Sequence, residues 1–340
     1  MTPAIFGLEG LAMTPSEHDF FKSAAPMGYI LFGRNVENRD QLRRLTDELR
    51  DLHGTAALPI LTDQEGGRVA RMQSPEWLRY PPAAMFEAIY LADAQRGVEA
   101  CRLNYEALAL DLADVGITVT CAPVLDVPVE GAHDVIGDRA FSHDPERVSA
   151  MGRACLDGLR AAGVDGVIKH IPGHGRAATD SHLALPHVDA SLSQLRNDLT
   201  PFKALSDASM AMTAHVIYES WDKDRCATLS PTVITDVIRG EIGFDGLLMS
   251  DDLDMKALSG DIGDLALEAQ TAGCDVVLNC WAKMDDMVAI AEKMSAPSSQ
   301  TIKRLERVMC GLSSTRPSAT LRDRQQALLA QRDALLGAWQ

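Results

Sequence analysis

The chain has 340 residues, of which 46% are hydrophobic and 24% charged, a balance that favours a globular protein with a large core and excludes a disordered chain. It carries 32 lysines and arginines against 48 acidic residues, a net charge of −16, so a nucleic acid or an anionic membrane surface would be repelled and is not expected as a partner. The seven cysteines are odd in number and show no Cys-x-x-Cys spacing, which predicts reduced cysteines in the core.

The first nine residues lack the basic and apolar regions of a secretory signal. No apolar run approaches the ~18 residues that a membrane-spanning helix needs. We therefore expect a cytoplasmic protein that does not bind membranes and acts as a monomer.

Short apolar segments rich in β-branched residues alternate with helical patterns along the chain, which predicts βαβ units around a parallel sheet. The predicted strands are 4–8, 28–32, 58–62, 117–122, 166–169, 210–215, 246–250 and 275–279. Eight strands with helical crossovers favour a closed (β/α)8 barrel, an α/β fold of the TIM type, over an open doubly wound sheet.

Several of the helices begin at recognisable signals. Thr14-Pro15-Ser16-Glu17 is a capping box with proline at the first helical position, and Ser230-Pro231 repeats the combination of cap and proline. After Asn38, leucines at positions 42, 45, 49 and 52 form one apolar face.

We expect a catalytic barrel over residues 1–297 and terminal helices over 298–340 that pack on it. Leucines and a valine recur among many charges in this last segment, which does not resemble a separate catalytic domain. The Ser/Pro-rich patches at 295–299 and 313–318 are short enough to be turns between helices.

Polar residues follow four of the predicted strands, where barrel enzymes carry their catalytic groups. Asp63 to Arg68 follow the third strand, His170 the fifth, and Asp251 and Asp252 the seventh, while His215 ends the sixth. A single aspartate or histidine here would usually cap a helix or sit in the core. Four strand ends that meet at one rim predict an active site.

The loop from Lys169 to His182 is the densest polar segment. Gly173 and Gly175 permit backbone conformations closed to other residues, so the loop has a particular shape. Asp180 lies two residues before His182, which allows its carboxylate to orient the imidazole. A histidine held in this way can protonate a leaving group and later deprotonate water.

Asp251 follows the apolar run Leu247-Leu248-Met249 and is expected to project into the barrel mouth from a rigid strand. A carboxylate held beside the anomeric carbon of a sugar can attack it and form a glycosyl-enzyme intermediate. Asp252 and Asp254 compete for this role, and helix capping is the alternative for all three.

With these residues in view, the chain resembles the single-domain β-N-acetylhexosaminidases of glycoside hydrolase family 3, the enzymes of cell-wall recycling. The resemblance spans residues 5 to about 280 and rests on five ordered motifs. They are Asp63-x-Glu65-Gly66-Gly67-Arg68-x-x-Arg71, Ile136-Gly137-Asp138-Arg139, Lys169-His170-x-Pro172-Gly173-His174-Gly175, Asp180-Ser181-His182 and Ser250-Asp251-Asp252-Leu253.

The resemblance implies a retaining exo-β-N-acetylglucosaminidase that releases N-acetylglucosamine from peptidoglycan-derived muropeptides, with Asp251 as nucleophile, His182 as acid/base and Asp180 as its partner. It implies that His174 braces the loop, and it implies no cofactor and no metal. The residues that it assigns to the terminal sugar are Asp63, Arg71, Arg139, Lys169 and His170. Gln64 departs from the family, since many relatives have histidine there.

Other functions stay open from the sequence. The substrate is a chito-oligosaccharide in one alternative, and phosphate rather than water resolves the intermediate in another. A metal-dependent hydrolase would use His170, His174, His182 and Asp180 as ligands. A Schiff-base lyase would use Lys169, and a non-catalytic protein would bind the sugar only.

Overall fold

The computed structural model describes residues 1–312 and 321–336, and its centre is a closed barrel of eight parallel strands. The barrel closes because β1 pairs with both β2 and β12. Each predicted strand overlaps one barrel strand, with ends that differ by at most two residues, so the predicted (β/α)8 barrel is confirmed. The strands are β1 (Thr2–Gly7), β2 (Pro26–Leu31), β3 (Ile60–Thr62), β6 (Val119–Thr120), β7 (Asp165–Ile171), β9 (Met210–Thr213), β11 (Leu247–Asp252) and β12 (Val276–Asn279).

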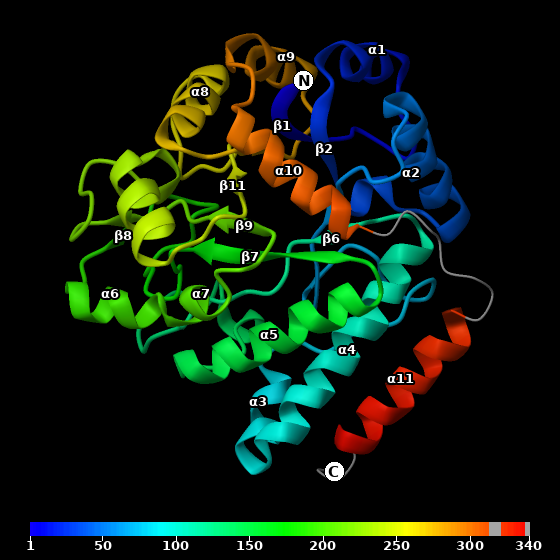
Figure 1. Ribbon diagram of the computed structural model, residues 1–340, viewed down its shortest axis with the longest axis vertical. Helices are drawn as coiled ribbons and strands as arrows, with labels where there is room; N and C mark the ends of the chain where they lie inside the picture. The colour runs from blue at the N-terminus through cyan, green and yellow to red at the C-terminus, as the bar shows by residue number, and fades with distance from the viewer. Residues whose placement is uncertain (313–320, 337–340) are drawn as a thin grey trace.

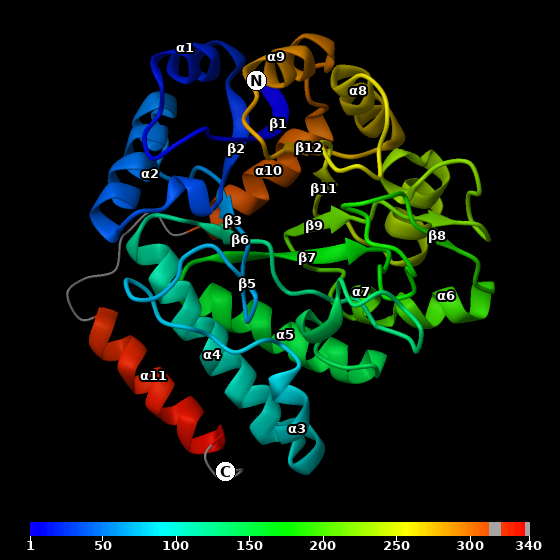
Figure 2. The same cartoon turned by 180° about the vertical axis from the view of Figure 1, so that it is seen from behind.

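Helices surround the barrel in Figures 1 and 2. The longer ones are α1 (Pro15–Ala24), α2 (Arg39–His53), α4 (Ala94–Asp114), α5 (Pro145–Ala161), α8 (Ile262–Ala272) and α9 (Met284–Lys293). The shorter ones are α3 (Met85–Ala92), α6 (Leu192–Asp198), α7 (Thr200–Ala204) and a π-helix over Val233–Glu241. Outside the barrel, β4 (Gln64–Gly66) pairs with β5 (Val69–Ala70), and β8 (His187–Val188) with β10 (Ile217–Tyr218).

The predicted helix starts are present. Thr14 Oγ1 accepts from Glu17 N at 3.2 Å, and the Glu17 carboxylate accepts from Thr14 N at 2.8 Å, which completes the capping box of α1. Ser230 Oγ accepts from Val233 N at 3.1 Å and caps the segment that leads into the π-helix. The leucine face of α2 is turned to the core, since Leu42, Leu45 and Leu49 are fully buried.

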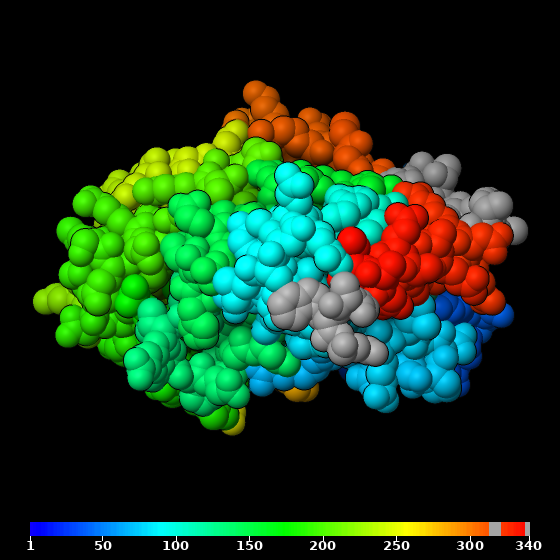
Figure 3. All heavy atoms as spheres, turned by 90° about the horizontal axis from the view of Figure 1, so that it is seen from below, coloured from blue at the N-terminus to red at the C-terminus, as the bar shows by residue number. Residues whose placement is uncertain are grey.

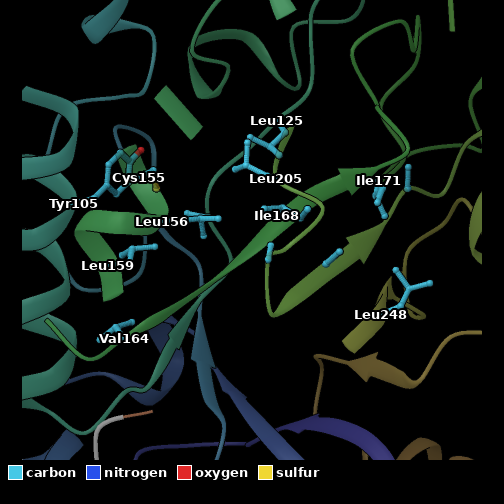
Figure 4. Packing of buried hydrophobic residues seen from close by; sticks show 14 of the residues in the cluster. Tyr105, Leu125, Cys155, Leu156, Leu159, Val164, Ile168, Ile171, Leu205 and Leu248 are labelled. Atoms are coloured by element: carbon cyan, nitrogen blue, oxygen red, sulfur yellow. The ribbon is translucent and has the colours of Figure 1, made fainter. Parts of the chain in front are cut away.

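Apolar side chains fill two layers, one inside the barrel and one between the strands and the helices. Figure 4 shows the outer layer, where Leu156 of α5 lies beside Ile168 of β7. The inner layer includes Leu305, Val308 and Leu312 from α10 (Ser299–Gly311) and its C-terminal end. Helix α10 closes the amino-terminal end of the barrel, since its Arg304 pairs with Asp245 just before β11 and with Asp275 just before β12.

Helix α11 (Leu321–Leu336) lies against α4, as the red and cyan surfaces of Figure 3 show. Gln325 Nε2 donates to Ala107 O at 3.1 Å, and Arg324 pairs with Glu106 at 2.6 Å. The division of the chain at residue 297 stays a prediction. The predicted turn at 313–318 lies outside the described residues.

The cysteines and the lengths of the helices bear on the expectations from composition. All seven cysteines are free, but Cys310 on α10 is exposed, so the prediction that all of them are core residues was wrong for this one. Cys310 stands two positions after the buried Val308, and an α-helix turns by about 100° per residue, so its side chain points to the solvent side of α10. No described helix has both the length and the apolar character to cross a membrane.

Candidate active site

A cavity of about 680 Å³ opens at the carboxyl ends of the barrel strands, and it brings the predicted site residues together. The predicted residues that line it are Asp63, Arg71, Arg139, Lys169, His170, His182 and Asp251. Asp180 does not line the cavity but contacts His182 from behind. Side chains from separate strand ends and loops therefore share one space, as the sequence predicts.

An alternating row of charges lies along one wall of the cavity. Lys169 Nζ lies 2.6 Å from Glu65 Oε1 and 3.2 Å from Asp63 Oδ1. Arg139 donates to both oxygens of Glu65 at 2.9 Å, and Arg71 donates to Asp63 at 3.0 Å. Burial opposes ionisation, but the neighbouring cations lower the pKa of Asp63 and Glu65, and the two carboxylates raise that of Lys169. The row is therefore fully charged and already paired before any ligand binds.

Glu65 is a site residue that the sequence reasoning missed, although it stands in a quoted motif. It connects Lys169 and Arg139, two of the predicted sugar-binding residues. Its place two residues after Asp63, on the short strand β4, was the available signal.

A second missed residue, Asp126, holds the start of the predicted catalytic loop. Its buried carboxylate accepts from His170 N at 3.2 Å and His174 N at 2.6 Å, and it lies 2.7 Å from His170 Nδ1. Burial alone would raise its pKa, but the two histidines lower it to about 2. His174 Nε2 lies 3.2 Å from Ser181 Oγ, and burial lowers the His174 pKa to about 4. His174 is therefore neutral and connects the two ends of the loop.

Asp251 stands at the end of β11 as an ionised carboxylate. Burial would raise its pKa, but His215, His170 and the N–H of Asp252 lower it. Within the described part of the chain, the only hydrogen bond to its carboxylate comes from Asp252 N, at 2.8 Å. The cavity-facing carboxylate is therefore charged and open to a ligand.

The two competing aspartates are engaged elsewhere. Asp252 Oδ1 accepts from Cys280 N at 3.1 Å and Asp254 N at 3.3 Å, and burial raises the Asp252 pKa to about 7. Asp254 accepts from Asn279 Nδ2 at 2.6 Å and pairs with Lys283 at 2.8 Å. Both carboxylates tie the end of β11 to the end of β12, which leaves Asp251 as the free one.

His182 lies on the loop that follows β7. Asp180 Oδ1 accepts from His182 N at 2.9 Å and lies 2.8 Å from His182 Nδ1. These two hydrogen bonds outweigh partial burial and lower the pKa of Asp180. With Nδ1 engaged, Nε2 is the ring nitrogen left for a ligand. The side chain is 63% exposed, and Ala257 N donates to Ser181 O at 3.2 Å, which brings this loop to the segment after β11.

The fold and the cavity define a barrel protein with the strand-end site of an enzyme, strongly charged along one wall. Residues 12–310 match the model of the glycosyl hydrolase family 3 N terminal domain. The chain belongs to this family and is a glycoside hydrolase.

Relatives with known names cover nearly the whole chain. A protein named Beta-hexosaminidase from Chromobacterium violaceum is 39% identical over 311 residues, 90% of this chain and 86% of that protein. The crystal structure of native NagZ from Neisseria gonorrhoeae superposes with a TM-score of 0.88 at 32% identity, covering 99% and 97% of the two chains. The predicted membership of the β-N-acetylhexosaminidases of family 3 is confirmed.

Proposed function

We propose that this enzyme is a retaining exo-β-N-acetylglucosaminidase with Asp251 as nucleophile and His182 as acid/base. One observation carries the proposal: an ionised carboxylate on a strand end and an imidazole oriented by Asp180 line the same cavity. A glycoside hydrolase that retains configuration needs one nucleophile and one group that exchanges a proton with the leaving oxygen.

The chemistry divides between the two groups. The Asp251 carboxylate attacks the anomeric carbon while His182 Nε2 donates its proton to the departing glycosidic oxygen, so a C–O bond forms as another breaks. The now neutral Nε2 then takes a proton from water, whose oxygen attacks the same carbon and releases Asp251. Asp180 accepts a hydrogen bond from Nδ1–H throughout and holds the ring in this orientation.

The charged wall suits the terminal sugar. The predicted binding residues Asp63, Arg71, Arg139 and Lys169 belong to it, and His170 stands beside it on Asp126. Guanidinium, ammonium and carboxylate groups fixed in place form directional hydrogen bonds with sugar hydroxyls at little entropic cost. A further crystal structure of the Neisseria relative, TM-score 0.88, holds N-trifluoroacetyl-D-glucosamine, which supports an N-acylated glucosamine as the terminal sugar here.

We propose peptidoglycan-derived muropeptides as the substrate and cell-wall recycling in the cytoplasm as the setting. The resemblance to the family 3 enzymes of cell-wall recycling, together with the similarity to NagZ from Neisseria gonorrhoeae, supports this. A chito-oligosaccharide is the alternative substrate. The monomeric state and the cytoplasmic location stay predictions.

The metal-dependent alternative finds less support. In residues 1–312 and 321–336, no group of three or more histidine, cysteine or acidic side chains is arranged to hold a metal ion. Zinc is named in one structure of the Neisseria relative, so chelation is a necessary control. Retained activity after exhaustive treatment with EDTA is expected, and a loss that zinc restores would favour the metal enzyme.

Product stereochemistry tests the proposed mechanism directly. Hydrolysis of 4-nitrophenyl N-acetyl-β-glucosaminide is followed by proton NMR, and the β anomer of N-acetylglucosamine is expected to appear first. Initial release of the α anomer would contradict a covalent intermediate on Asp251. The same spectra in phosphate buffer show whether a sugar 1-phosphate forms instead of the free sugar.

A further inference from the structure

The cavity rim beside β11 and β12 carries an exposed tryptophan that the proposed mechanism does not use. Trp281 lines the cavity, yet 62% of it is exposed. Among the exposed large hydrophobic side chains of the described residues, it is the one that lines this cavity. An indole has a large apolar face, and an exposed one at the mouth of a binding site offers that face to a ligand.

The backbone before Trp281 is fixed by the barrel. Cys280 N donates to Asp252 Oδ1 at 3.1 Å, and Cys280 O accepts from Arg34 Nη2. The same carbonyl lies so close to Gly7 that a Cβ there would be 2.2 Å from it. The residue before Trp281 therefore cannot move without disturbing β1, β11 and the segment after β2.

The backbone after Trp281 is equally constrained. Ala282 has φ 57°, a left-handed conformation that is unfavourable for a residue other than glycine. Lys283 pairs with Asp254 at 2.8 Å and holds the far side of the turn. The backbone on both sides of Trp281 is thus held in place, so little backbone entropy is lost when a ligand stacks on the ring.

A cation lies on the same sector of the rim. Lys256 lines the cavity, is exposed and has no ion pair with any residue of the described ranges. It follows β11, and Trp281 follows β12, the strand hydrogen-bonded to β11. Lys169 and Lys283, which also line the cavity, are both paired with carboxylates. Lys256 is therefore available to an anionic group of the substrate.

We propose that Trp281 and Lys256 form the subsite for the leaving part of the substrate, and that this part is a second pyranose ring carrying a carboxylate. The axial C–H groups of the ring stack on the indole, and the carboxylate pairs with the ammonium group. The inference rests on the proposed function and deepens it. It distinguishes a carboxylated second sugar from the neutral one of a chito-oligosaccharide.

Three substrates with the same terminal N-acetylglucosamine separate the two contributions. The trifluoroethyl β-glycoside has no ring in its leaving group, N,N′-diacetylchitobiose has a neutral ring, and the disaccharide with N-acetylmuramic acid has a carboxylated ring. Trp281→Ala is expected to lower kcat/KM about tenfold on both disaccharides and to leave the trifluoroethyl glycoside unchanged. Trp281→Phe, which keeps an aromatic face, is expected to restore most of the loss.

The role of Lys256 is tested by comparing kcat/KM on the carboxylated and the neutral disaccharide. Lys256→Gln is expected to lower kcat/KM about three- to fivefold on the carboxylated disaccharide alone, and 0.5 M NaCl should abolish the difference from the wild type. Leu91→Ala, at a leucine that is 60% exposed on α3, and Lys223→Gln, at an exposed lysine outside the cavity, are matched controls.

The outcomes separate this inference from the proposed function. An equal loss of kcat/KM on all three substrates with Trp281→Ala, or no loss on the disaccharides, would contradict the proposed stacking of the second sugar on Trp281. An equal effect of Lys256→Gln on both disaccharides would contradict the proposed pairing of Lys256 with a carboxylate on the second sugar. A wild-type enzyme that releases no N-acetylglucosamine from any of the three substrates would contradict the proposed function itself.

Discussion

The charged wall of the cavity and the loop that carries His182 are built in opposite ways. On the wall, the Lys169 and Glu65 side chains are 3% and 6% exposed and each contacts two partners of opposite charge. On the loop, His182 is 63% exposed and its ring contacts Asp180. This contrast indicates that the proposed sugar-binding wall is preorganised by the barrel, whereas the proposed proton-transfer group lies on an exposed loop.

Asp251 belongs to the rigid half, and its removal is expected to have the largest effect. Asp251→Asn keeps the shape of the side chain but has no charge to attack the anomeric carbon, so kcat should fall by on the order of 10⁴ or more on every substrate. Steady-state rates on the nitrophenyl glycoside measure this loss. With Asp251→Ala, added azide should form the α-glycosyl azide in a single displacement; formation of the β-azide would contradict the assignment.

His182 tests the exposed half. His182→Ala is expected to lower kcat/KM about 10²- to 10⁴-fold on a glycoside with a poor leaving group, because the departing oxygen then leaves without a proton. The nitrophenyl glycoside, whose leaving group needs no proton, should lose far less in the first step. His187→Ala, at another exposed histidine that lies 3.6 Å from a carboxylate, is the matched control. Equal losses on both glycosides would exclude His182 as the acid.

The two halves also differ in how far the sequence predicted them. The barrel strands follow from short apolar runs, and the strand-end residues Lys169 and Asp251 follow from their place after such runs. Glu65 and Asp126 were missed because their importance lies in contacts across the barrel, with Arg139 74 positions away and His170 44 positions away. No local pattern encodes such pairings, whereas the pair Asp180 and His182, two positions apart, was predictable.

Replacing the buried Lys169 should lower the stability of the protein more than replacing an exposed lysine. Lys169→Met leaves Asp63 and Glu65 facing one another in a buried site, so unfolding free energy should fall by about 3–5 kcal/mol. Lys203→Met is the control, since Lys203 pairs with Glu241 while 40% exposed and should cost less than about 1 kcal/mol. Urea denaturation measures both. Equal losses would show that the buried charges of the wall stabilise the fold no more than an exposed ion pair does.

Asp252, next to the proposed nucleophile Asp251, is expected to give the smallest effect, and this effect depends on pH. Its folded-state pKa of about 7 lies above the value near 3.9 expected in the unfolded chain, so the proton is bound more tightly in the folded state. The stability associated with that proton is fully present below pH 3.9 and is lost as pH rises through 7. Asp252→Asn keeps an oxygen for Cys280 N and Asp254 N but does not titrate.

The stability of Asp252→Asn relative to the wild type should therefore increase by about 2–3 kcal/mol between pH 5 and pH 8. Urea denaturation of the two proteins across this range measures the gap, in which all other titrations cancel. Asp224→Asn, at an exposed aspartate, controls for the loss of one negative charge. A stability difference that stays constant with pH would mean that Asp252 is ionised throughout this range in the folded protein. Burial would then not protonate this carboxyl, and Asp252 would resemble the ionised carboxylates of the wall.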